Sequence, residues 1–460
     1  MNNRTTDVAV IGAGLSGLSV AFALKQRGIG VRVFEQSDRI GGQIRTYREG
    51  GFVFESGPNT GIISRCEVLD LFGNLSQRAL LLRAAPQAER RLIFKDGAFH
   101  PLPSGFWSAL ATNLFTWRDK LRILGEPFRK RGIDPNESVA DLVRRRLGVS
   151  YFRYAVDPFV GGIYAGDPES LVTRFALPKL YALEATYGSF IRGAIAKMGF
   201  SEAKQGEQVD KSIFSTVGGL SSFIEALGRE IDLANVQLGA RIRELSQVEG
   251  GDWQISFEVD GRMEQVQARY LVSTVGSYAY RGLFGFLSDD DLAPIEALRY
   301  APIVQVAVGY RHIPNVDFRA FGGLIPSCED RDLLGLLNPS ACFHGRAPEG
   351  GMLLSAFLGG MRSPDLIDWP EEKITDLLLL RLKVMLGIEQ RPDLLKVFRH
   401  PYAIPQYEAS TGERLQKMTE IEERFPRLIL AGNLRDGVGI PDRIAQGYGI
   451  AQRLASVWQG

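Results

Sequence analysis

A glycine-rich turn near the N-terminus constrains the fold more than any other segment of the chain. Residues 7–12 read DVAVIG, an apolar run typical of a buried parallel strand, and residues 12–17 read GAGLSG, a GxGxxG sequence. Apolar residues then recur at helical spacing, and a second strand, residues 30–34, ends at Glu35, 23 residues after the first glycine. This order of strand, glycines, helix, strand and acid predicts a βαβ unit that binds a dinucleotide.

Each glycine of this turn has its own physical reason. Gly12 permits the tight turn, Gly14 lets the backbone approach a pyrophosphate at the helix N-terminus, and Gly17 lets the helix pack closely on the sheet. Glu35 can accept both hydroxyls of an adenosine ribose, and its charge repels a 2′-phosphate. The cofactor contacts predicted for this unit are Gly12, Gly14, Leu15, Ser16, Gly17, Glu35 and Gln36.

The segment directly after the ribose acid carries a second pair of glycines. Residues 36–46 read QSDRIGGQIRT, which resembles the second phosphate-side motif of FAD enzymes of the amine-oxidase superfamily. Gly41 and Gly42 let the chain pass near the cofactor. Arg39 or Arg45 is expected either to balance pyrophosphate charge or to hold an active-site loop, and Arg39 is counted among the cofactor contacts.

Two later segments return the chain to the same cofactor. Residues 270–276, YLVSTVG, are predicted to form a buried strand, preceded by a short strand region at 236–242 and a hairpin around residues 260–261. Residues 427–433, RLILAGN, form another strand before GVGIPD, whose proline suits the first turn of the helix that follows. The cofactor contacts predicted here are Val236, Thr274, Val275, Gly432, Asn433, Gly439, Ile440 and Pro441.

Segments spread over nearly the whole chain make a more specific resemblance. They resemble, in the same order along the chain, segments of the oxygen-dependent porphyrinogen oxidases, flavoenzymes that make protoporphyrin or coproporphyrin for haem. The matching segments are residues 51–59 (GFVFESGPN), 157–168 (DPFVGGIYAGDP), 321–326 (FGGLIP), 343–348 (FHGRAP), 400–407 (HPYAIPQY) and 437–442 (GVGIPD).

The resemblance implies an α/β (α+β) fold with three parts. A discontinuous Rossmann-like FAD/NAD(P)-binding domain is expected from residues 1–85, 205–285 and 405–460. A substrate-binding domain with a mixed sheet is expected from residues 86–100 and 286–404. Residues 101–204 are expected to form a helical insertion of the kind that relatives often use at membranes.

The resemblance also implies a reaction and a set of site residues. Non-covalent FAD would remove six electrons from a porphyrinogen in three rounds, with O₂ as acceptor and H₂O₂ released, and no dedicated acid or base is assigned. By this resemblance Arg91 holds a propionate, Leu324 and Phe343 sandwich the ring, and Asn59 lies near the flavin. Gly161 lets a loop pass over the substrate, and Gly57 and Pro58 contact the cofactor.

The identity of the substrate stays open in the sequence. Protoporphyrinogen IX is favoured because only one propionate anchor can be assigned, whereas coproporphyrinogen III, with four propionates, would need additional cations. Candidates for those cations are Arg174, Lys179, Arg346 and Arg362. A flavin amine oxidase, a carotenoid desaturase and a non-catalytic flavoprotein are the remaining alternatives.

The helical insertion combines apolar and basic residues. Residues 117–146 hold nine Lys or Arg against five Asp or Glu, a local net charge of +4. Such a segment is compatible with docking on an anionic membrane surface and equally with an ordinary solvated helix face. The apolar residues in and before this segment are Leu102, Phe106, Trp107, Leu110, Leu114, Phe115 and Trp117.

Composition excludes several other classes of protein. A net charge of +1 lacks the electrostatic footprint of a nucleic-acid-binding protein. Three cysteines make no disulfide framework, and four scattered histidines predict no metal site. We expect no signal peptide or membrane-spanning segment and therefore a cytoplasmic protein, peripheral on the inner membrane face if the insertion docks there. Homodimerisation and transfer of product to the next haem-pathway enzyme are left open. Arg443, in the first turn of a helix, is expected to have an anionic partner.

Overall fold

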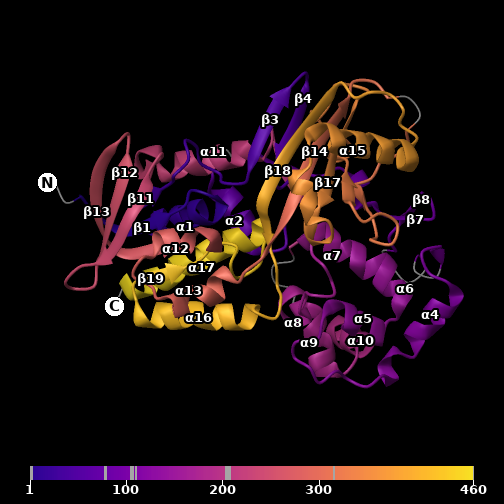
Figure 1. Cartoon of the computed structure of the whole chain (residues 1–460), viewed down its shortest axis with the longest axis horizontal. Helices are drawn as coiled ribbons and strands as arrows, with labels where there is room; N and C mark the ends of the chain where they lie inside the picture. Colours follow the sequence, from indigo (N-terminus) through magenta and orange to yellow (C-terminus); the bar gives the residue numbers. More distant parts are fainter. Residues whose placement is uncertain are drawn as a thin grey trace.

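The computed structural model describes residues 4–76, 80–103, 108, 111–201, 209–313 and 316–458, so Phe106, Trp107 and Leu110 lie outside the described residues. Two seven-stranded sheets dominate it, with a lobe of helices beside the second sheet (Figure 1). The first sheet has the order β10–β2–β1–β13–β12–β11, and β19 pairs with β13. Its strands are β1 (Arg4–Ile11), β2 (Val31–Phe34), β10 (Val236–Gln237), β11 (Arg241–Gln247), β12 (Trp253–Val259), β13 (Arg262–Ser273) and β19 (Leu428–Leu430).

Strand β13 joins the parallel and antiparallel parts of this sheet. Its first half pairs antiparallel with β12, and its second half pairs parallel with β19, while β1 runs parallel along most of its length. The predicted hairpin is present, with Asp260 (φ 50°) and Gly261 (φ 72°) in its turn. The sequence predicted two separate strands where the structure has one continuous strand of 12 residues.

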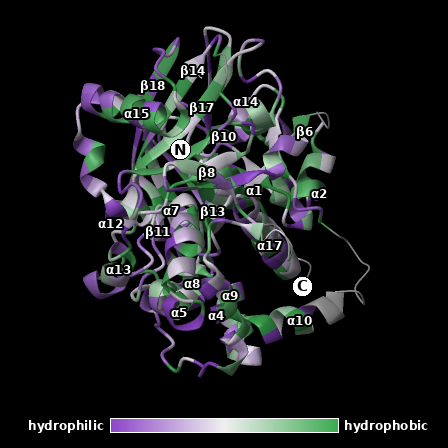
Figure 2. Cartoon of the chain, turned by 90° about the vertical axis from the view of Figure 1, so that its right-hand side faces the viewer, coloured by the Kyte–Doolittle hydropathy of each residue, from purple (hydrophilic) through white to green (hydrophobic). Residues whose placement is uncertain are grey.

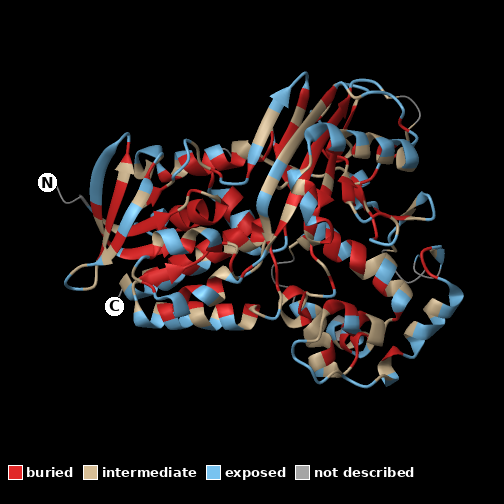
Figure 3. Ribbon diagram, in the orientation of Figure 1, coloured by how far each residue is buried: buried red, intermediate tan, exposed pale blue. Residues whose placement is uncertain are grey.

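Alternating side chains of β1 enter two different cores. Val8 and Val10 pack on one face of the sheet, and Ala9 and Ile11 pack on the other. Helix α1 is buried from Leu15 to Leu24 and is coloured as buried in Figure 3. Helix α17 crosses it so closely that a Cβ at Gly447 would lie 2.6 Å from the carbonyl carbon of Ser19. The first face is covered by α1 (Leu15–Lys25), α2 (Cys66–Asn74), α11 (Leu220–Ile231) and α17 (Ile440–Trp458).

The opposite face is covered by α12 (Tyr280–Leu283), α13 (Asp289–Glu296) and α16 (Thr411–Arg424). Leu292 and Ile295 of α13 share a core with Met418 of α16. The sequence had assigned residues from 286 onward to the second domain. By its packing α13 belongs to the first sheet, so the boundary predicted at residue 285 is placed too early.

The second sheet is mixed, as predicted. Its order is β18–β14–β17–β16–β15–β7–β8, and only the β15–β7 pair is parallel. Helix α15 (Glu371–Leu386) packs against one face, and α14 (Pro339–Cys342) follows β16. The strands are β7 (Arg91–Lys95), β8 (Ala98–Pro101), β14 (Tyr300–Tyr310), β15 (Gly322–Leu324), β16 (Leu333–Leu337), β17 (Met352–Gly359) and β18 (Leu394–Pro405).

Two small sheets connect the two seven-stranded sheets and the helices packed on them. The ribbon of β3 (Arg45–Glu49) and β4 (Phe52–Ser56) is antiparallel. In the other, β9 (Ile213–Thr216) lies between β5 (Gly61–Ile62) and β6 (Leu81–Arg83).

Helices of residues 117–201 gather at one end of the molecule, away from β14 and β18 (Figure 2). Side-chain caps start two of them: Thr116 accepts from the Asp119 N–H, and Ser138 accepts from the Asp141 N–H. None of the helices in the described ranges has the length and hydropathy of a bilayer-spanning segment. The helices are α4 (Trp117–Leu124), α5 (Val139–Arg146), α6 (Val149–Tyr151), α7 (Asp157–Tyr164), α8 (Thr173–Ala176), α9 (Pro178–Tyr187) and α10 (Phe190–Ser201).

Candidate functional site

The first and third glycines of the N-terminal turn are required by the packing of the chain itself. Gly12 has φ 100°, and a Cβ there would lie 2.7 Å from Oγ1 of Thr274. A Cβ at Gly17 would lie 1.9 Å from the carbonyl oxygen of Gly12. Both positions therefore exclude any larger residue, whether or not a ligand binds.

Gly14 differs from these two glycines. Its backbone is extended (φ −70°, ψ 176°), which any residue adopts, and the nearest atom to a Cβ there is the Cα of Gly42 at 3.9 Å. No side chain caps the N–H groups at the start of α1, where Leu15 and Ser16 follow. These uncapped N–H groups and the open space beside Gly14 fit a pyrophosphate at the positive end of the helix.

The second glycine pair lies against the first turn. The N–H of Gly41 donates to the carbonyl of Ala13 at 2.8 Å, and Gly14 and Gly41 form a parallel bridge. Arg39 donates to the carbonyls of Ile40 (3.2 Å), Ile44 (3.1 Å) and Gly42 (2.5 Å). Arg39 therefore holds this loop, and its contact with the cofactor stays a prediction, while Arg45 lies over the ring of Tyr47, 4.7 Å from its centroid.

The carboxylate of Glu35 faces the glycine turn, at the edge where the strands end. Its Oε2 accepts from the Ala13 N–H at 2.8 Å, and its Oε1 accepts from the N–H (2.9 Å) and hydroxyl (2.8 Å) of Ser37. The N–H of Glu35 donates to Gln237 in β10, beside the predicted contact Val236. Gln36 is exposed. The acid and β10 thus lie where a nucleoside joined to a pyrophosphate at Gly14 would extend.

The carboxyl ends of β1, β13 and β19 meet at this site. Thr274 donates through Oγ1 to the carbonyl of Ile11 at 2.9 Å, and Val275 follows it. A Cβ at Gly432 (φ 89°) would lie 2.7 Å from the carbonyl oxygen of Thr274. Asn433 is half-buried, so the structure brings the N-terminal, middle and C-terminal segments predicted for one cofactor together.

The C-terminal helix begins next to this junction. The N–H of Gly439 donates to Oδ2 of Asp442 at 3.2 Å, and α17 starts with the buried pair Ile440 and Pro441. Arg65 forms an ion pair with Asp442 at 3.0 Å. The start of α17 is therefore held by Asp442 in its first turn and by Arg65, the residue just before α2.

Arg443 does not have the anionic partner that the sequence predicted. It is buried, and it donates to the carbonyls of Gly432 and Arg435 and to Oε1 of Gln446, all of them neutral acceptors. No carboxylate within the described ranges forms an ion pair with it. Burial lowers the pKa of Arg443. Its function in the fold is to hold the loop that follows β19.

The sequence matches the family model described as flavin containing amine oxidoreductase over residues 15–455. The chain belongs to the flavin-containing amine oxidoreductases. This confirms the superfamily that the sequence predicted. The cofactor of such an enzyme is a flavin, and the uncapped N–H groups of α1, the space beside Gly14 and the acid Glu35 fit one that carries a dinucleotide.

Individual relatives cover almost the whole length of this flavoenzyme. Protoporphyrinogen oxidase 2 of Arabidopsis thaliana is 28% identical, with 98% of this chain and 94% of the relative covered. Coproporphyrinogen III oxidase of Bacillus subtilis is 25% identical, with 97% of each chain covered. A solved structure from Exiguobacterium sp. 255-15, provisionally named protoporphyrinogen oxidase, has a TM-score of 0.81 at 21% identity and covers 99% of each chain. The structural match confirms the predicted fold class.

Residues 57–59 link the glycine loops of this flavoenzyme to its second sheet. A Cβ at Gly57 (φ 96°) would lie 2.2 Å from the carbonyl oxygen of Gln43, and the Gly57 N–H donates to Oε1 of Gln305 in β14 at 2.7 Å. Asn59 is buried and donates to the Gly57 carbonyl at 3.2 Å, and Pro58 is half-buried. Gly57, Pro58 and Asn59 therefore lie where the glycine loops of the first domain contact strand β14 of the second sheet.

The predicted substrate residues occupy two separate places on the second sheet. Leu324 of β15 pairs with Ile93 of β7, and a Cβ at Gly162 would lie 2.4 Å from its Cδ2 atom. Arg91 begins β7 with an exposed side chain that has no hydrogen-bond or ion-pair partner within the described ranges. Phe343 is buried in another cluster, next to Cys342. A ring held between Leu324 and Phe343 stays a proposal.

Two of the four additional cations are already neutralised. Arg346 forms a buried ion pair with Glu55 at 2.8 Å, and Arg362 forms one with Asp157 at 2.8 Å. Arg174 donates to the neutral amide oxygen of Asn136 at 2.8 Å, and Lys179 is exposed. The sequence offered no signal for either ion pair, because the partners are 291 and 205 residues apart.

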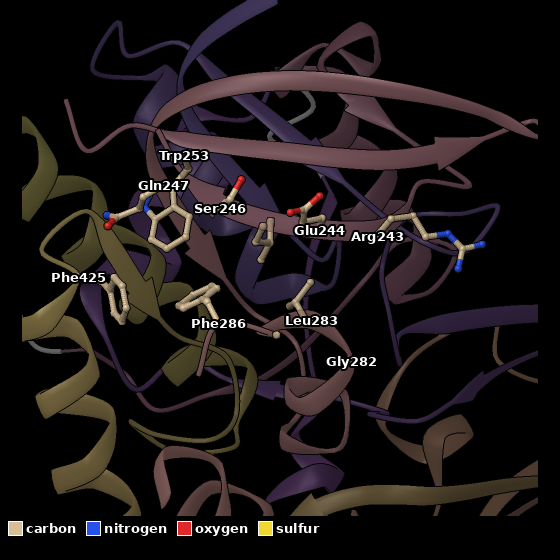
Figure 4. A pocket seen from close by; sticks show the side chains of 11 residues that line it. Arg243, Glu244, Ser246, Gln247, Trp253, Gly282, Leu283, Phe286 and Phe425 are labelled. Atoms are coloured by element: carbon tan, nitrogen blue, oxygen red, sulfur yellow. The ribbon is translucent and has the colours of Figure 1, made fainter. Parts of the chain in front are cut away.

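One hollow lies away from the glycine turn. A pocket of about 420 Å³ opens beside the antiparallel end of the first sheet, where Trp253, Phe286 and Phe425 form its aromatic side (Figure 4). None of the glycine-turn residues lines it. Among the residues described here, no group of three or more His, Cys, Asp or Glu side chains could hold a metal ion.

Proposed function

We propose that this flavoenzyme is an FAD-dependent porphyrinogen oxidase of haem biosynthesis. It converts protoporphyrinogen IX to protoporphyrin IX with three molecules of O₂, which take up the six electrons and leave as three molecules of H₂O₂. The same oxidation of coproporphyrinogen III to coproporphyrin III is the alternative substrate assignment. Relatives with both names support the reaction over nearly the full length of the chain.

One observation of the structure carries the proposal. The guanidinium of Arg91 is unpaired within the described ranges, and it lies on the same face of the second sheet as the partly buried Leu324, at the edge of the apolar cluster around Ile93. A porphyrinogen is a wide apolar ring with carboxylates, so it needs an apolar wall with a cation at its edge. Because Glu55 and Asp157 already neutralise Arg346 and Arg362, the structure favours the substrate with fewer carboxylates.

The residues of the chain act by binding and orientation. When bound, FAD supplies two-electron oxidation. The glycine turn and Glu35 hold the cofactor non-covalently at the carboxyl ends of β1 and β13. Arg91 orients the substrate through a propionate, and the apolar surface excludes water from the ring. Orientation of this kind, without a dedicated acid or base, accounts for the chemistry.

Anaerobic addition of each porphyrinogen to the purified holoenzyme tests the function. We expect protoporphyrinogen IX to bleach the oxidised flavin band quickly, and air to restore the band as porphyrin fluorescence appears. Faster bleaching by coproporphyrinogen III would transfer the assignment to the alternative substrate. If neither compound bleaches the flavin, the porphyrinogen proposal is wrong.

Replacement of Arg91 tests the substrate anchor. Arg91→Ala is expected to raise KM by about 10- to 100-fold because a charge-assisted hydrogen bond to a carboxylate contributes about 1.5–3 kcal/mol. Arg91→Lys should fall between, since an ammonium cannot make the bidentate contact. Arg90→Ala is the matched control, an exposed neighbour whose guanidinium donates to the Arg319 carbonyl at 3.3 Å. Equal KM values for the two alanine variants would contradict the anchor.

We also infer a membrane-docking surface on the helical insertion, the surface of α4 and the loop after it. Trp117, Leu121 and Leu124 recur on one face of α4 and are 68%, 64% and 68% exposed. Phe128 (84% exposed) and Ile133 (98%) follow α4 in the chain, and α4 is coloured mostly as exposed in Figure 3. The basic side chains on the same segment include Arg118, Arg122, Lys130 and Arg131, which match the charge of anionic lipids.

Vesicle sedimentation tests this surface. The holoenzyme should sediment with vesicles that contain phosphatidylglycerol and stay in solution with pure phosphatidylcholine. The Leu121→Asp/Phe128→Asp variant should bind at least about tenfold more weakly, because each buried apolar side chain contributes about 1.5–3 kcal/mol. Leu380→Asp, at a 52% exposed leucine of α15, is the control. Equal sedimentation of the two variants would contradict the surface.

A further inference from the structure

Helix α7 (Asp157–Tyr164) approaches the second sheet through residues that have no side chain. Figure 1 shows it between that sheet and the other helices of the insertion. A Cβ at Gly162 would lie 2.4 Å from Cδ2 of Leu324, and a Cβ at Gly161 would lie 2.8 Å from Nη2 of Arg362. Because no side chain separates the helix from Leu324, the contacts at the two ends of the helix set its height above the sheet.

The N-terminal end of α7 is held by a buried ion pair. Nη2 of Arg362 donates to both Oδ1 and the main-chain carbonyl of Asp157, each at 2.8 Å. The other carboxylate oxygen of Asp157 accepts from the Ser327 N–H at 2.7 Å. Asp157 is 3% exposed and Arg362 is 7% exposed, so neither charge has water as an alternative partner.

The C-terminal end of α7 is held by the residue next to Arg362. The N–H of Met361 donates to the carbonyl of Ala165 at 2.7 Å, directly after the helix. A Cβ at Gly360 would lie 2.5 Å from that same oxygen. One three-residue turn, η7 (Gly360–Arg362), therefore contacts both ends of α7. Since η7 follows β17 without a break, it fixes the helix relative to the middle of the sheet.

The segment directly before α7 departs from a regular α-helix. Residues Phe152–Val156 form a π-helical stretch, η4, in which the regular α-helical bonding is interrupted. The contacts from η7 and the Ser327 N–H restrain the first turn of α7, and Val160 packs into the core of the insertion. Arg331 in turn restrains η7, because its Nε donates to the Arg362 carbonyl at 2.9 Å.

We propose that Arg362 is a positioning residue which, through Asp157, holds α7 in contact with Leu324 and so fixes the place of this side chain against a bound tetrapyrrole ring. The inference rests on the function proposed above. Arg362 does not touch the substrate in this role. A lysine keeps the charge, but its single nitrogen on a shorter side chain cannot hold Asp157 and also reach the Ile325 carbonyl, to which Nη1 of Arg362 donates at 3.4 Å. Loss of this geometry should let the helix move without removing the buried charge.

Kinetics and hydrogen exchange of the full-length holoenzyme test this role together. Arg362→Lys should raise KM for protoporphyrinogen IX by about tenfold and leave kcat within about twofold, since the reacting groups are untouched. Amide exchange in residues 158–166 should become about tenfold faster, while exchange in α1 and the flavin content stay as in the parent enzyme. Asp157→Asn, which keeps the shape of the side chain, should show the same pattern and serves if Arg362→Lys fails to fold.

Arg146→Lys is the matched control. Arg146 is fully buried in the helical insertion that also contains α7, and its Nε lies 3.0 Å from Oε1 of Glu126. It does not contact α7. Its replacement should change neither KM nor exchange in residues 158–166. If Arg362→Lys behaves like Arg146→Lys in both measurements, the positioning role is wrong. If the parent enzyme oxidises no porphyrinogen, the proposed function is wrong, and with it the substrate role of Arg362. The amide exchange data would still show whether Arg362 restrains helix α7.

Discussion

Gly14→Ala is expected to weaken flavin binding at least about tenfold while the fold persists. The extended backbone at Gly14 tolerates alanine, and the new Cβ would find only the Cα of Gly42, at 3.9 Å. The methyl group would, however, occupy the space through which the backbone approaches a pyrophosphate. Flavin released per protein on denaturation measures binding, and thermal unfolding should show a loss of stability below about 1 kcal/mol.

Two other glycines separate this effect from a general loss of packing. Gly73→Ala in α2 places a Cβ where no atom lies within 4 Å and should retain all of the flavin. Gly17→Ala should fail to fold, because its Cβ would lie 1.9 Å from the Gly12 carbonyl oxygen. Full flavin content in Gly14→Ala would mean that the pyrophosphate does not pass this residue.

Local patterns predicted the parts of this fold that local physics determines. The alternation of Val8, Ala9, Val10 and Ile11 sends side chains to two faces, and the glycines at fixed spacing mark the turn that follows. The hairpin turn at residues 260–261 was likewise readable, because glycine and aspartate tolerate positive φ. The glycine loops and the βαβ unit could therefore be predicted from short stretches of sequence, whereas the three-part fold came from the family resemblance.

Features that depend on distant partners could not be predicted in this way. Nothing in the sequence around α13 says that Leu292 packs against Met418, so the domain boundary was placed too early. Arg443 was expected to meet an anion because a cation in a first helical turn is unfavourable. In the structure, main-chain carbonyls of the loop after β19 accept its hydrogen bonds, and such acceptors have no sequence signature.

The candidate cations show the same limit for function. By residue type alone, Arg91, Arg346 and Arg362 all suit a carboxylate of the substrate, and only the family resemblance singled out Arg91. Only the fold reveals that two of them already pair with Glu55 and Asp157, each buried with its arginine. The number of substrate carboxylates that the site can bind is therefore determined by the tertiary structure.

Arg346→Ala is expected to lower the free energy of unfolding by about 3–5 kcal/mol, because it leaves a buried carboxylate without its counter-charge. Glu55 is 3% exposed, and it also accepts from the Thr46 hydroxyl at 2.6 Å and the Leu220 N–H at 3.0 Å. Arg346 further donates to Ser215 at 2.5 Å, so the ion pair ties β4, β9 and the loop before β17 together. Urea unfolding followed by circular dichroism measures the change.

The double variant Glu55→Gln/Arg346→Met should recover most of that loss, since a neutral pair removes the buried charge. Arg243→Ala is the surface control: its pair with Glu258, at 2.5 Å, is half exposed, and its loss should cost less than about 1 kcal/mol. If Arg346 serves only to stabilise the fold, Arg346→Ala should lose much stability. The KM for porphyrinogen of the protein that remains folded should then be unchanged. An unchanged stability with a raised KM would make Arg346 a second substrate cation, and the balance would then move toward coproporphyrinogen III.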